Sequence, residues 1–232
     1  MNNMQIAIIA GGLGTRLGPI TKNTPKSMIM ISGKPFIEYQ IHLLKKAGIN
    51  NIVMCLGHQG ELIHDYCGDG SKFGLNIKYS CESNPLDTAG ALKLASHLLE
   101  DYFFTLYGDS YILVDFYEML TRLLSKNKLA LMSVYKNSNQ FDRSNTIIEN
   151  DVVTFYNKEK SEGCNYIDYG VNLFNKDVLR YIPENTPYSL GTLFAKLIEQ
   201  KELLAYQVEK RFYEIGSFYG LKEFSKYIEE VQ

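Results

Sequence analysis

A short apolar strand that runs directly into a glycine-rich turn is the feature that most limits what this chain can fold into. Residues 6–9 are apolar and are followed at once by AGGLGTRL, residues 10–17. Three glycines are more than a turn after a buried strand usually needs, which indicates a backbone that another group must approach closely. Successive backbone N–H groups in such a turn bind phosphate oxygens. The pattern therefore predicts a buried strand that ends in a phosphate-binding loop.

This loop differs from the two best-known phosphate-binding motifs. Leu17 stands where the last glycine of G-x-G-x-x-G would be, and no Gly-Lys-Ser/Thr closes the loop as in a P-loop. Lys26, which follows after an intervening segment, offers a point charge to the same phosphates, and Arg16 offers a planar fork. A plain tight turn followed by an exposed arginine is the alternative explanation.

The rest of the first half alternates between strand and helix patterns. We expect strands at residues 5–9, 51–56, 76–80, 103–106 and 130–135, with helices at residues 35–47, 58–66, 89–99 and 116–125. This alternation favours an α/β fold with a parallel sheet and helices on both faces. The chain has 232 residues and 45% of them are hydrophobic, which is enough to bury such a core.

After about Lys136 short strands alternate with polar turns. Strands are expected at residues 145–149, 152–157, 167–174 and 203–208, and helices at residues 189–201 and 221–231. Most of this half should form a small antiparallel lobe that covers the substrate. Because no linker or repeat separates the halves, we expect one domain, residues 1–232, with lobes at residues 1–135 and 136–232.

Charge and cysteine content exclude several other classes of protein. The net charge is −2, so nucleic acid and anionic membranes are not expected partners. The cysteines Cys55, Cys67, Cys81 and Cys164 have no metal-ligand spacing. The apolar run near the N-terminus is short and lacks a basic flank, so we expect a cytoplasmic protein with reduced thiols and no membrane span.

The stretch AGGLGTRLGPITKNTPKSMIMISGKPFIEYQI resembles the opening of the sugar-1-phosphate nucleotidyltransferases. That family opens with G-G-x-G-T-R-L, continues with P-K-P and then starts a helix with G-x-P-[FLM]; here Ser27 replaces the second proline. The resemblance extends over nearly the whole chain. It implies a Rossmann-like, mixed but mostly parallel sheet flanked by helices, and an Mg²⁺-dependent reaction in which a sugar 1-phosphate attacks the α-phosphate of a nucleoside triphosphate and releases pyrophosphate.

The resemblance also implies roles for individual residues. Arg16, Lys26 and Lys158 would be catalytic, and Lys158, Asp168 and Gly170 would bind the acceptor. Asp109, after the strand at residues 103–106, and Glu214 would hold Mg²⁺. The expected nucleotide-binding residues are Ala10, Gly11, Gly12, Gly14, Thr15, Arg16, Glu82, Pro85, Thr88, Gly90 and Asp109. Helix capping is the alternative for Asp109 and Thr88, and a surface position is the alternative for Glu214 and Lys158.

Three departures from the family pattern leave the substrates open. Besides Ser27, Asn157 replaces a usual glutamate and Glu214 replaces a usual aspartate. GTP with a heptose or hexose 1-phosphate is the preferred pair, and UTP, CTP or dTTP and a phosphorylated non-sugar acceptor are alternatives. A catalytically silent regulatory homologue is the alternative of another class, although Arg16 and Lys26 are present. A homodimer is the expected assembly.

Overall fold

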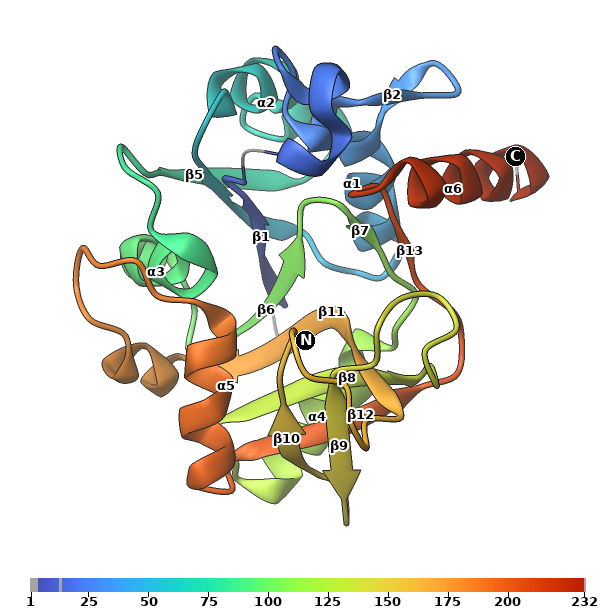
Figure 1. Ribbon diagram of the computed structural model, residues 1–232. Helices are drawn as coiled ribbons and strands as arrows, with labels where there is room; N and C mark the ends of the chain where they lie inside the picture. The colour runs from blue at the N-terminus through green and yellow to red at the C-terminus, as the bar shows by residue number, and fades with distance from the viewer. Residues whose placement is uncertain (1–3, 13, 232) are drawn as a thin grey trace.

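The computed structural model describes residues 4–12 and 14–231, and its centre is one mixed sheet (Figure 1). The strands lie in the order β5-β4-β1-β6-β11-β8-β12-β10-β9. Their bounds are β1 Gln5–Ala10, β4 Asn51–Leu56, β5 Asn76–Cys81, β6 Tyr102–Tyr107, β8 Ala130–Lys136, β9 Thr146–Glu149, β10 Val152–Tyr156, β11 Tyr166–Asn175 and β12 Leu203–Val208. Strands from both halves of the chain therefore join one sheet.

The strands of the first half form the parallel part of the sheet. β1 pairs in parallel with β4 on one side and β6 on the other, and β4 pairs in parallel with β5. Their apolar residues are deeply buried; Ile6 and Ile8, for example, are 0% exposed. Apolar runs of this kind are typical of strands that are covered on both faces. Because β1 and β6 are parallel neighbours, the glycine loop after β1 and Asp109 after β6 lie at the same edge.

The expectation of a mostly parallel sheet with a separate antiparallel lobe is only partly met. β11 pairs antiparallel with both β6 and β8, β9 pairs antiparallel with β10 and β11, and β10 pairs antiparallel with β12. β8 and β12 are parallel. The successive pairings β8-β11-β9-β10-β12-β8 close on themselves. The sheet is therefore evenly mixed, and its antiparallel strands continue the central sheet because β11 pairs directly with β6.

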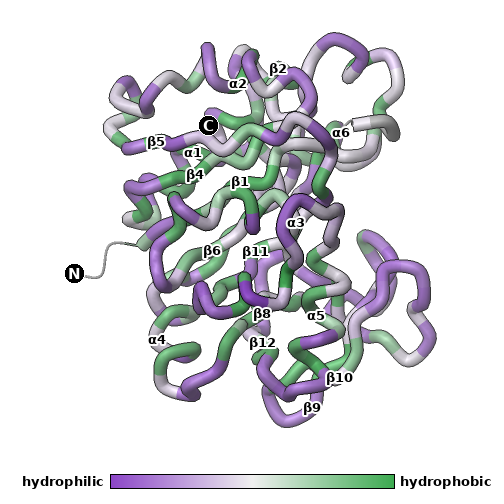
Figure 2. The backbone as a smooth tube through the Cα atoms, turned by 90° about the vertical axis from the view of Figure 1, so that its left-hand side faces the viewer, coloured by the Kyte–Doolittle hydropathy of each residue, from purple (hydrophilic) through white to green (hydrophobic). Residues whose placement is uncertain are grey.

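Helices cover both faces of the sheet, as the alternating pattern predicts. α1 (Phe36–Lys46), α2 (Gly60–Cys67) and α4 (Phe116–Lys126) pack in the hydrophobic cluster on one face, and α3 (Asp87–Leu94) and α5 (Leu190–Glu199) pack in the cluster on the other. Figure 2 shows the apolar colouring concentrated on β1, β4 and β6 between these layers. α6 (Phe218–Val231) packs in a third cluster, with Phe36 of α1 and with Ile29 and Ile31.

Some element bounds differ from the expected ones. The predicted helix at residues 89–99 begins at Asp87 and changes at Ala95 into a 3₁₀ turn, Ala95–Leu98. The predicted terminal helix begins at Phe218, ahead of residue 221. Short elements complete the fold: the hairpin β2 (Met30–Ile31) and β3 (Lys34–Pro35), and the pair β7 (Ser110–Tyr111) and β13 (Tyr213–Glu214). None of the helices in the described residues is long and apolar enough to cross a membrane.

Candidate active site

The three glycines after β1 have three different surroundings. A Cβ on Gly11 would lie 2.9 Å from Oε1 of Glu82, and one on Gly14 would lie 3.1 Å from Cγ of Lys26. Gly12 is exposed and a Cβ there would meet nothing within 4 Å. Close packing against the side chains of Glu82 and Lys26 therefore favours glycine at Gly11 and Gly14. Gly12 leaves its backbone open to a ligand.

Gly14 is also held in a conformation that favours glycine. Its φ is +68°, which places it in the left-handed region. The Thr21 hydroxyl donates to the Gly14 carbonyl at 2.9 Å and fixes the turn. The 3₁₀ segment Thr15–Thr21 follows. The predicted site residues Thr15 and Arg16 lie in this segment, and their side chains are outside the described part of the structure.

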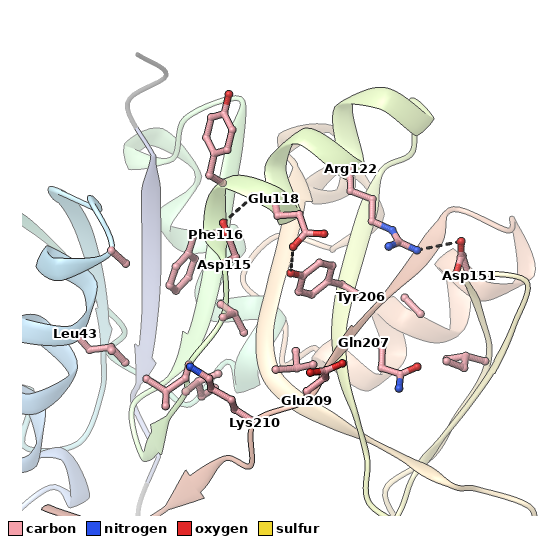
Figure 3. Close-up of a pocket in the computed structure, with 18 residues that line it drawn as sticks. Leu43, Asp115, Phe116, Glu118, Arg122, Asp151, Tyr206, Gln207, Glu209 and Lys210 are labelled. Carbon is pink, nitrogen blue, oxygen red and sulfur yellow. Dashed lines mark hydrogen bonds and ion pairs between the residues drawn. The ribbon is translucent and has the colours of Figure 1, made fainter. Parts of the chain in front are cut away.

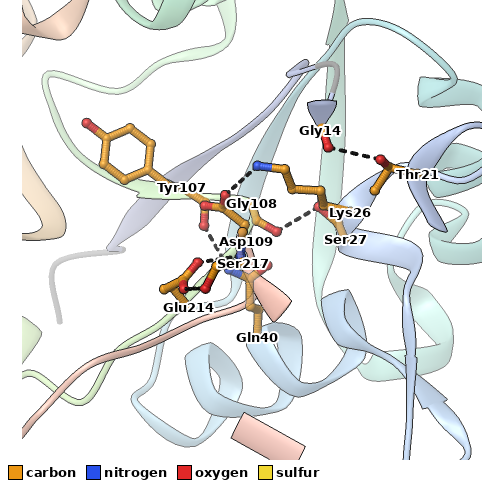
Figure 4. Close-up of polar contacts among 11 residues, drawn as sticks. Gly14, Thr21, Lys26, Ser27, Gln40, Tyr107, Gly108, Asp109, Glu214 and Ser217 are labelled. Atoms are coloured by element: carbon orange, nitrogen blue, oxygen red, sulfur yellow. Dashed lines mark hydrogen bonds and ion pairs between the residues drawn. The ribbon is translucent and has the colours of Figure 1, made fainter. Parts of the chain in front are cut away.

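Lys26 and Asp109 form an ion pair across the end of the sheet. Nζ of Lys26 lies 2.9 Å from Oδ2 of Asp109, and the side chains are 17% and 24% exposed (Figure 4). Lys26 begins a 3₁₀ turn after Pro25, and Asp109 follows directly after β6. The contact fixes the orientation of both side chains. From the sequence, Lys26 is expected to bind the phosphates and Asp109 to bind Mg²⁺. The ion pair brings these two side chains together.

Ser27 ties the Lys26 turn to the Asp109 turn. Its hydroxyl is buried and donates to the Gly108 carbonyl at 2.7 Å (Figure 4). A Cβ on Gly108 would lie 2.9 Å from this hydroxyl and 2.8 Å from Cβ of Ala10, so only glycine fits. The serine that departs from the family's proline therefore has a clear structural role. The sequence alone marked it only as a departure.

One cavity adjoins this ion pair, and a second cavity shares lining residues with the first. The smaller has a volume of about 160 Å³ and is lined by Ala10, Gly12, Lys26, Thr88 and Asp109 among others. The larger has a volume of about 520 Å³ and is lined by Gly11, Gly12, Glu82, Pro85 and Thr88, and also by Gly57 and His58. Gly12 and Thr88 line both. The structure therefore brings most of the residues expected to bind the nucleotide to one continuous region.

Glu82 lies between the glycine loop and the larger cavity. Its Oε2 accepts from the Leu86 backbone N–H at 3.0 Å, and its Oε1 packs near Gly11 and Gly57. Burial raises the pKa of Glu82, and the nearby Asp87 raises it further, while the Leu86 hydrogen bond opposes both. Gly57, which follows β4, was not singled out from the sequence. The signal was present, because it is a second glycine directly after a buried strand.

Thr88 and Gly90 hold the start of α3 against the second half of the chain. The Thr88 hydroxyl accepts from the Leu190 backbone N–H at 2.7 Å. A Cβ on Gly90 would lie 2.9 Å from the Thr186 carbonyl oxygen. Thr88 lines both cavities, whereas Gly90 lines neither. Close packing, rather than contact with a cavity, accounts for Gly90.

The three expected acceptor residues gather around the ring of Tyr107. Lys158 places Nζ 5.5 Å from the ring centroid, and a Cβ on Gly170 would lie 3.4 Å from Cδ2 of the ring. Asp168 accepts from the Gly170 backbone N–H at 2.9 Å. Burial raises the pKa of Asp168 to about 6, against the effects of the Gly170 N–H and of Lys158. Tyr107 itself lines the smaller cavity, so it joins this group to the Lys26–Asp109 pair.

Glu214 lies close to Asp109 in the fold, but its carboxylate is engaged locally. In the pair of strands β13 and β7, Glu214 lies opposite Ser110. The Ile215 N–H donates to the Asp109 carbonyl at 2.9 Å. The Glu214 carboxylate accepts from the Gly216 N–H and the Ser217 hydroxyl at the start of α6 (Figure 4). Gly220 packs against the same carboxylate so closely that a Cβ would clash. Ser217 is the residue that caps α6, because its hydroxyl accepts from the Gly220 N–H at 2.9 Å, and the Glu214 carboxylate holds this hydroxyl in place.

The donor set fits Mg²⁺ better than it fits a metal held by protein alone. The described residues contain no group of three or more His, Cys, Asp or Glu side chains placed to hold a metal. Mg²⁺ usually binds one or two carboxylates and completes its coordination with water and substrate phosphates. Asp109 faces the smaller cavity and bonds Lys26 through Oδ2. Its second oxygen is available for such a role.

A third cavity, larger than these two, lies elsewhere, and its lining contains none of the expected site residues. It has a volume of about 810 Å³ and is lined by residues of α4 and β12 together with Leu43 and Ala47 (Figure 3). Its polar groups are largely engaged with one another: Tyr206 donates to Glu118, and Arg122 pairs with Asp151 at 3.0 Å. The motif residues converge on the other two cavities, which we take as the candidate active site.

Comparison with known proteins shows the family. The Nucleotidyl transferase family model matches residues 6–231. D-glycero-alpha-D-manno-heptose 1-phosphate guanylyltransferase of Campylobacter jejuni is 32% identical over 216 residues, 92% of this chain and 95% of its own. The enzyme of the same name from Aneurinibacillus thermoaerophilus is 34% identical over 218 residues, 92% and 93% of the two chains.

Solved structures show the same fold. HddC from Yersinia pseudotuberculosis complexed with GMP-PN has a TM-score of 0.81 and 24% identity, covering 97% of this chain and 99% of that one. A putative glucose-1-phosphate thymidylyltransferase from Bacillus anthracis has a TM-score of 0.83 and 22% identity, covering 97% and 94%. Together with the family match over residues 6–231, these findings show that the chain belongs to the nucleotidyl transferase family and is a nucleotidyltransferase.

Proposed function

We propose that this chain transfers the guanylyl group of GTP to a heptose or hexose 1-phosphate, which forms a nucleoside diphosphate sugar and releases pyrophosphate. The observation that carries the proposal is the Lys26–Asp109 ion pair, 2.9 Å long, at a cavity that also borders the glycine loop. A cation and a carboxylate fixed at this edge are suited to a phosphate chain and its divalent ion. The heptose-1-phosphate guanylyltransferases named above support the choice of substrates.

Glu82 supports guanine as the base. An ionised carboxylate only accepts hydrogen bonds, and the Watson–Crick edge of guanine offers two adjacent N–H donors. Uracil and thymine instead place one N–H between two carbonyl oxygens, and a carboxylate repels these two oxygens. Glu82 lines the cavity of about 520 Å³, next to Gly11 and Gly57. Guanine donors would also favour the ionised form of Glu82, whose pKa burial raises.

Lys26, Arg16, Lys158 and the glycine loop are the proposed catalytic and phosphate-binding groups. The open backbone at Gly12, with Arg16, would hold the β- and γ-phosphates, and Lys26 would neutralise the α-phosphate. Lys158 would bind the acceptor phosphate, with Asp168 and Gly170 beside it. An oxygen of the acceptor phosphate attacks the α-phosphorus of the nucleotide. The bond between the α-phosphorus and the oxygen that bridges to the β-phosphate breaks, and pyrophosphate leaves. No proton transfer is required, so the task of the protein is positioning and charge stabilisation.

Asp109 and Glu214 are the proposed Mg²⁺ ligands. When bound, Mg²⁺ supplies positive charge to the phosphate oxygens. Asp109 faces the cavity directly. Glu214 would take part either through a lone pair left free by its hydrogen bonds to Gly216 and Ser217 or after those bonds open. In this proposal residues 1–135 hold the nucleotide and residues 136–232 hold the sugar phosphate, within one domain.

The test is pyrophosphate release with Mg²⁺, in which each nucleoside triphosphate is crossed with a panel of sugar 1-phosphates and phosphorylated small amines. We expect strong release from GTP with a heptose or hexose 1-phosphate. Lys26→Met should lower kcat by about a thousandfold, and the exposed control Lys226→Met should leave it unchanged. Strong release from another pair would replace the substrates proposed here. Binding of GTP without release from any pair would favour a regulatory role.

A further inference from the structure

A buried glutamine of α1 reaches the turn that carries Asp109. This turn spans residues 107–110, and we call it the Asp109 turn. Nε2 of Gln40 donates to the Tyr107 carbonyl at 2.9 Å and to the Ser110 carbonyl at 2.6 Å (Figure 4). These partners lie 67 and 70 residues away from it in the chain. One amide group therefore holds the first and the last residue of the Asp109 turn.

The two carbonyl partners fix which way the Gln40 amide points. A carbonyl oxygen only accepts hydrogen bonds, so the amide meets two of them with its nitrogen, which carries two N–H donors. The opposite orientation would place the amide oxygen against both carbonyl oxygens, where it would be repelled. Both donors of Gln40 are therefore engaged by the Asp109 turn.

The oxygen of the same amide is not satisfied in this way. Among the described residues, Oε1 of Gln40 is buried and makes no hydrogen bond, and the side chain is 0% exposed. Buried polar atoms usually have partners, because an unpaired one loses its hydration without compensation. The amide is thus placed for its two donors, although its oxygen is left unpaired. A local conflict of this kind is typical of residues that serve a functional site.

The remaining backbone oxygens of the Asp109 turn are fixed as well. The Gly108 carbonyl accepts from the Ser27 hydroxyl at 2.7 Å, and the Asp109 carbonyl accepts from the Ile215 N–H at 2.9 Å. Together with the bonds from Gln40, each backbone carbonyl of the turn has a donor from another part of the chain. Loss of the Gln40 amide would release both ends of the turn at once.

The side chain that this turn presents is the proposed metal ligand. Asp109 lines the cavity of about 160 Å³, and its Oδ2 lies 2.9 Å from Nζ of Lys26. Mg²⁺ demands nearly ideal octahedral geometry with short bonds, so a carboxylate ligand must be held closely in place. Loss of a group that orients a metal ligand typically lowers metal affinity or activity by roughly tenfold to a hundredfold.

We propose that Gln40 is a positioning residue for the metal site, which fixes the Asp109 turn so that the Asp109 carboxylate can meet Mg²⁺ and the nucleotide phosphates together. This inference rests on the proposed function, because it deepens the role assigned there to Asp109. Gln40 lines neither cavity of the candidate active site, so it acts only through the turn. Loss of its amide should weaken the effect of Mg²⁺ on nucleotide binding and leave metal-free binding unchanged.

The experiment measures by calorimetry how much Mg²⁺ tightens nucleotide binding, as the ratio of the Kd in EDTA to the Kd in Mg²⁺. GTP is the first probe, without an acceptor, and UTP, CTP and dTTP follow. Gln40→Met nearly keeps the length and helix propensity of the side chain and removes both donors. We expect the ratio to fall about tenfold and the Kd in EDTA to stay the same. In an Asp109→Asn background, Gln40→Met should cause no further fall, because its effect passes through Asp109.

Gln5→Met is the matched control. Gln5 is 4% exposed at the start of β1, and its amide also serves the backbone: it donates to the Leu98 carbonyl at 3.0 Å and accepts from the Glu100 N–H at 2.8 Å. Gln5→Met should lower the urea midpoint of unfolding about as much as Gln40→Met does, and should leave the Mg²⁺ ratio unchanged.

Three results would overturn the inference: a wild-type ratio in Gln40→Met, an equal fall in Gln5→Met, or a further fall in the Asp109→Asn background. If Gln40→Met does not fold, Gln40→Asn is measured in its place, because its amide is one methylene too short to reach both carbonyls. The same outcomes then decide.

Failure of the proposed function would give a different result. If no acceptor releases pyrophosphate but Mg²⁺ tightens nucleotide binding to the wild type and much less to Gln40→Met, the inference stands and only the reaction is rejected. If Mg²⁺ tightens the binding of none of the four nucleotides to the wild type, the metal assignment and the inference both fail.

Discussion

Nζ of Lys26 and Oδ2 of Asp109, 83 residues apart in the chain, lie 2.9 Å from each other at the edge of the sheet. Both side chains line the smaller cavity, and each holds the other in place. Asp109→Asn removes the negative charge with almost no change of shape. We expect turnover to fall by about a thousandfold or more while the circular dichroism spectrum stays the same. An Asp109→Asn protein that kept full activity would show that the metal assignment is wrong.

Ser27→Ala tests the bond that joins the two turns. It leaves the Gly108 carbonyl without its buried donor, so Lys26 should lose its fixed position relative to Asp109. We expect kcat to fall about tenfold, in line with the roughly 1–2 kcal/mol that such an unpaired group costs, with little change in KM. Ser125→Ala, which removes an exposed hydroxyl on α4, is the control. A parallel rise in KM would mean that Ser27 mainly shapes binding.

Glu214 is predicted to be a metal ligand and is observed to accept hydrogen bonds from the two residues that precede α6, and two substitutions separate these roles. Glu214→Ala should lower the stability by about 1–2 kcal/mol, because Gly216 and Ser217 lose their acceptor. Glu214→Gln keeps an acceptor but loses the charge. We expect it to raise the Mg²⁺ concentration for half-maximal activity about tenfold with a small change in melting temperature. An unchanged Mg²⁺ requirement in Glu214→Gln would leave Glu214 only its structural role before α6.

Glu82→Gln tests base selection. Gln still accepts from the Leu86 N–H but presents a mixed donor and acceptor to the cavity. We expect kcat/KM for GTP to fall about tenfold to a hundredfold and the value for UTP to stay the same or rise. Glu61→Gln, at an exposed position of α2, should change neither. Equal losses for both nucleotides would argue against contact between Glu82 and the base.

Asp168 should make the protein less stable as the pH rises, because its carboxyl group is buried. Burial raises its pKa from 3.8 to about 6, so the folded protein binds this proton more tightly than the unfolded chain does. The ionised group therefore costs stability as the pH rises through this range, and the cost is complete above about pH 6. Asp168→Asn should gain stability relative to wild type between pH 4 and pH 7, by at most about 3 kcal/mol. Urea unfolding measures this difference, and a constant difference across the range would contradict the expected shift.

Much of the site could be predicted because its signals are local. Apolar runs that end in glycine identified β1 and β6, and parallel strands bring their ends to one edge whatever the details of packing. The motif residues Lys26, Asp109 and Lys158 were therefore expected near one another. The helices were also expected on both faces, because apolar residues recur along them with helical spacing.

A mixed sheet was predicted, but its large antiparallel share was not, because pairing direction depends on where a strand enters the sheet. β11 lies between β6 and β8 and pairs antiparallel with both, which no local pattern specifies. Ser27 and Gly57 were missed as site residues for a similar reason. Their roles come from partners at least 25 residues away, such as Gly108 for Ser27 and Glu82 for Gly57.

The sequence by itself determined the class of fold, the glycine-rich loop after β1 and the family, because each of these depends on residues that are near one another in the chain. The tertiary structure alone decided that Ser27 fixes Lys26 against Asp109, that Glu214 holds the hydroxyl of Ser217, and that Tyr107 joins the smaller cavity to Asp168. These are contacts between side chains and backbone brought together by the closing of the sheet. Their geometry is set by packing, which is a property of the whole fold.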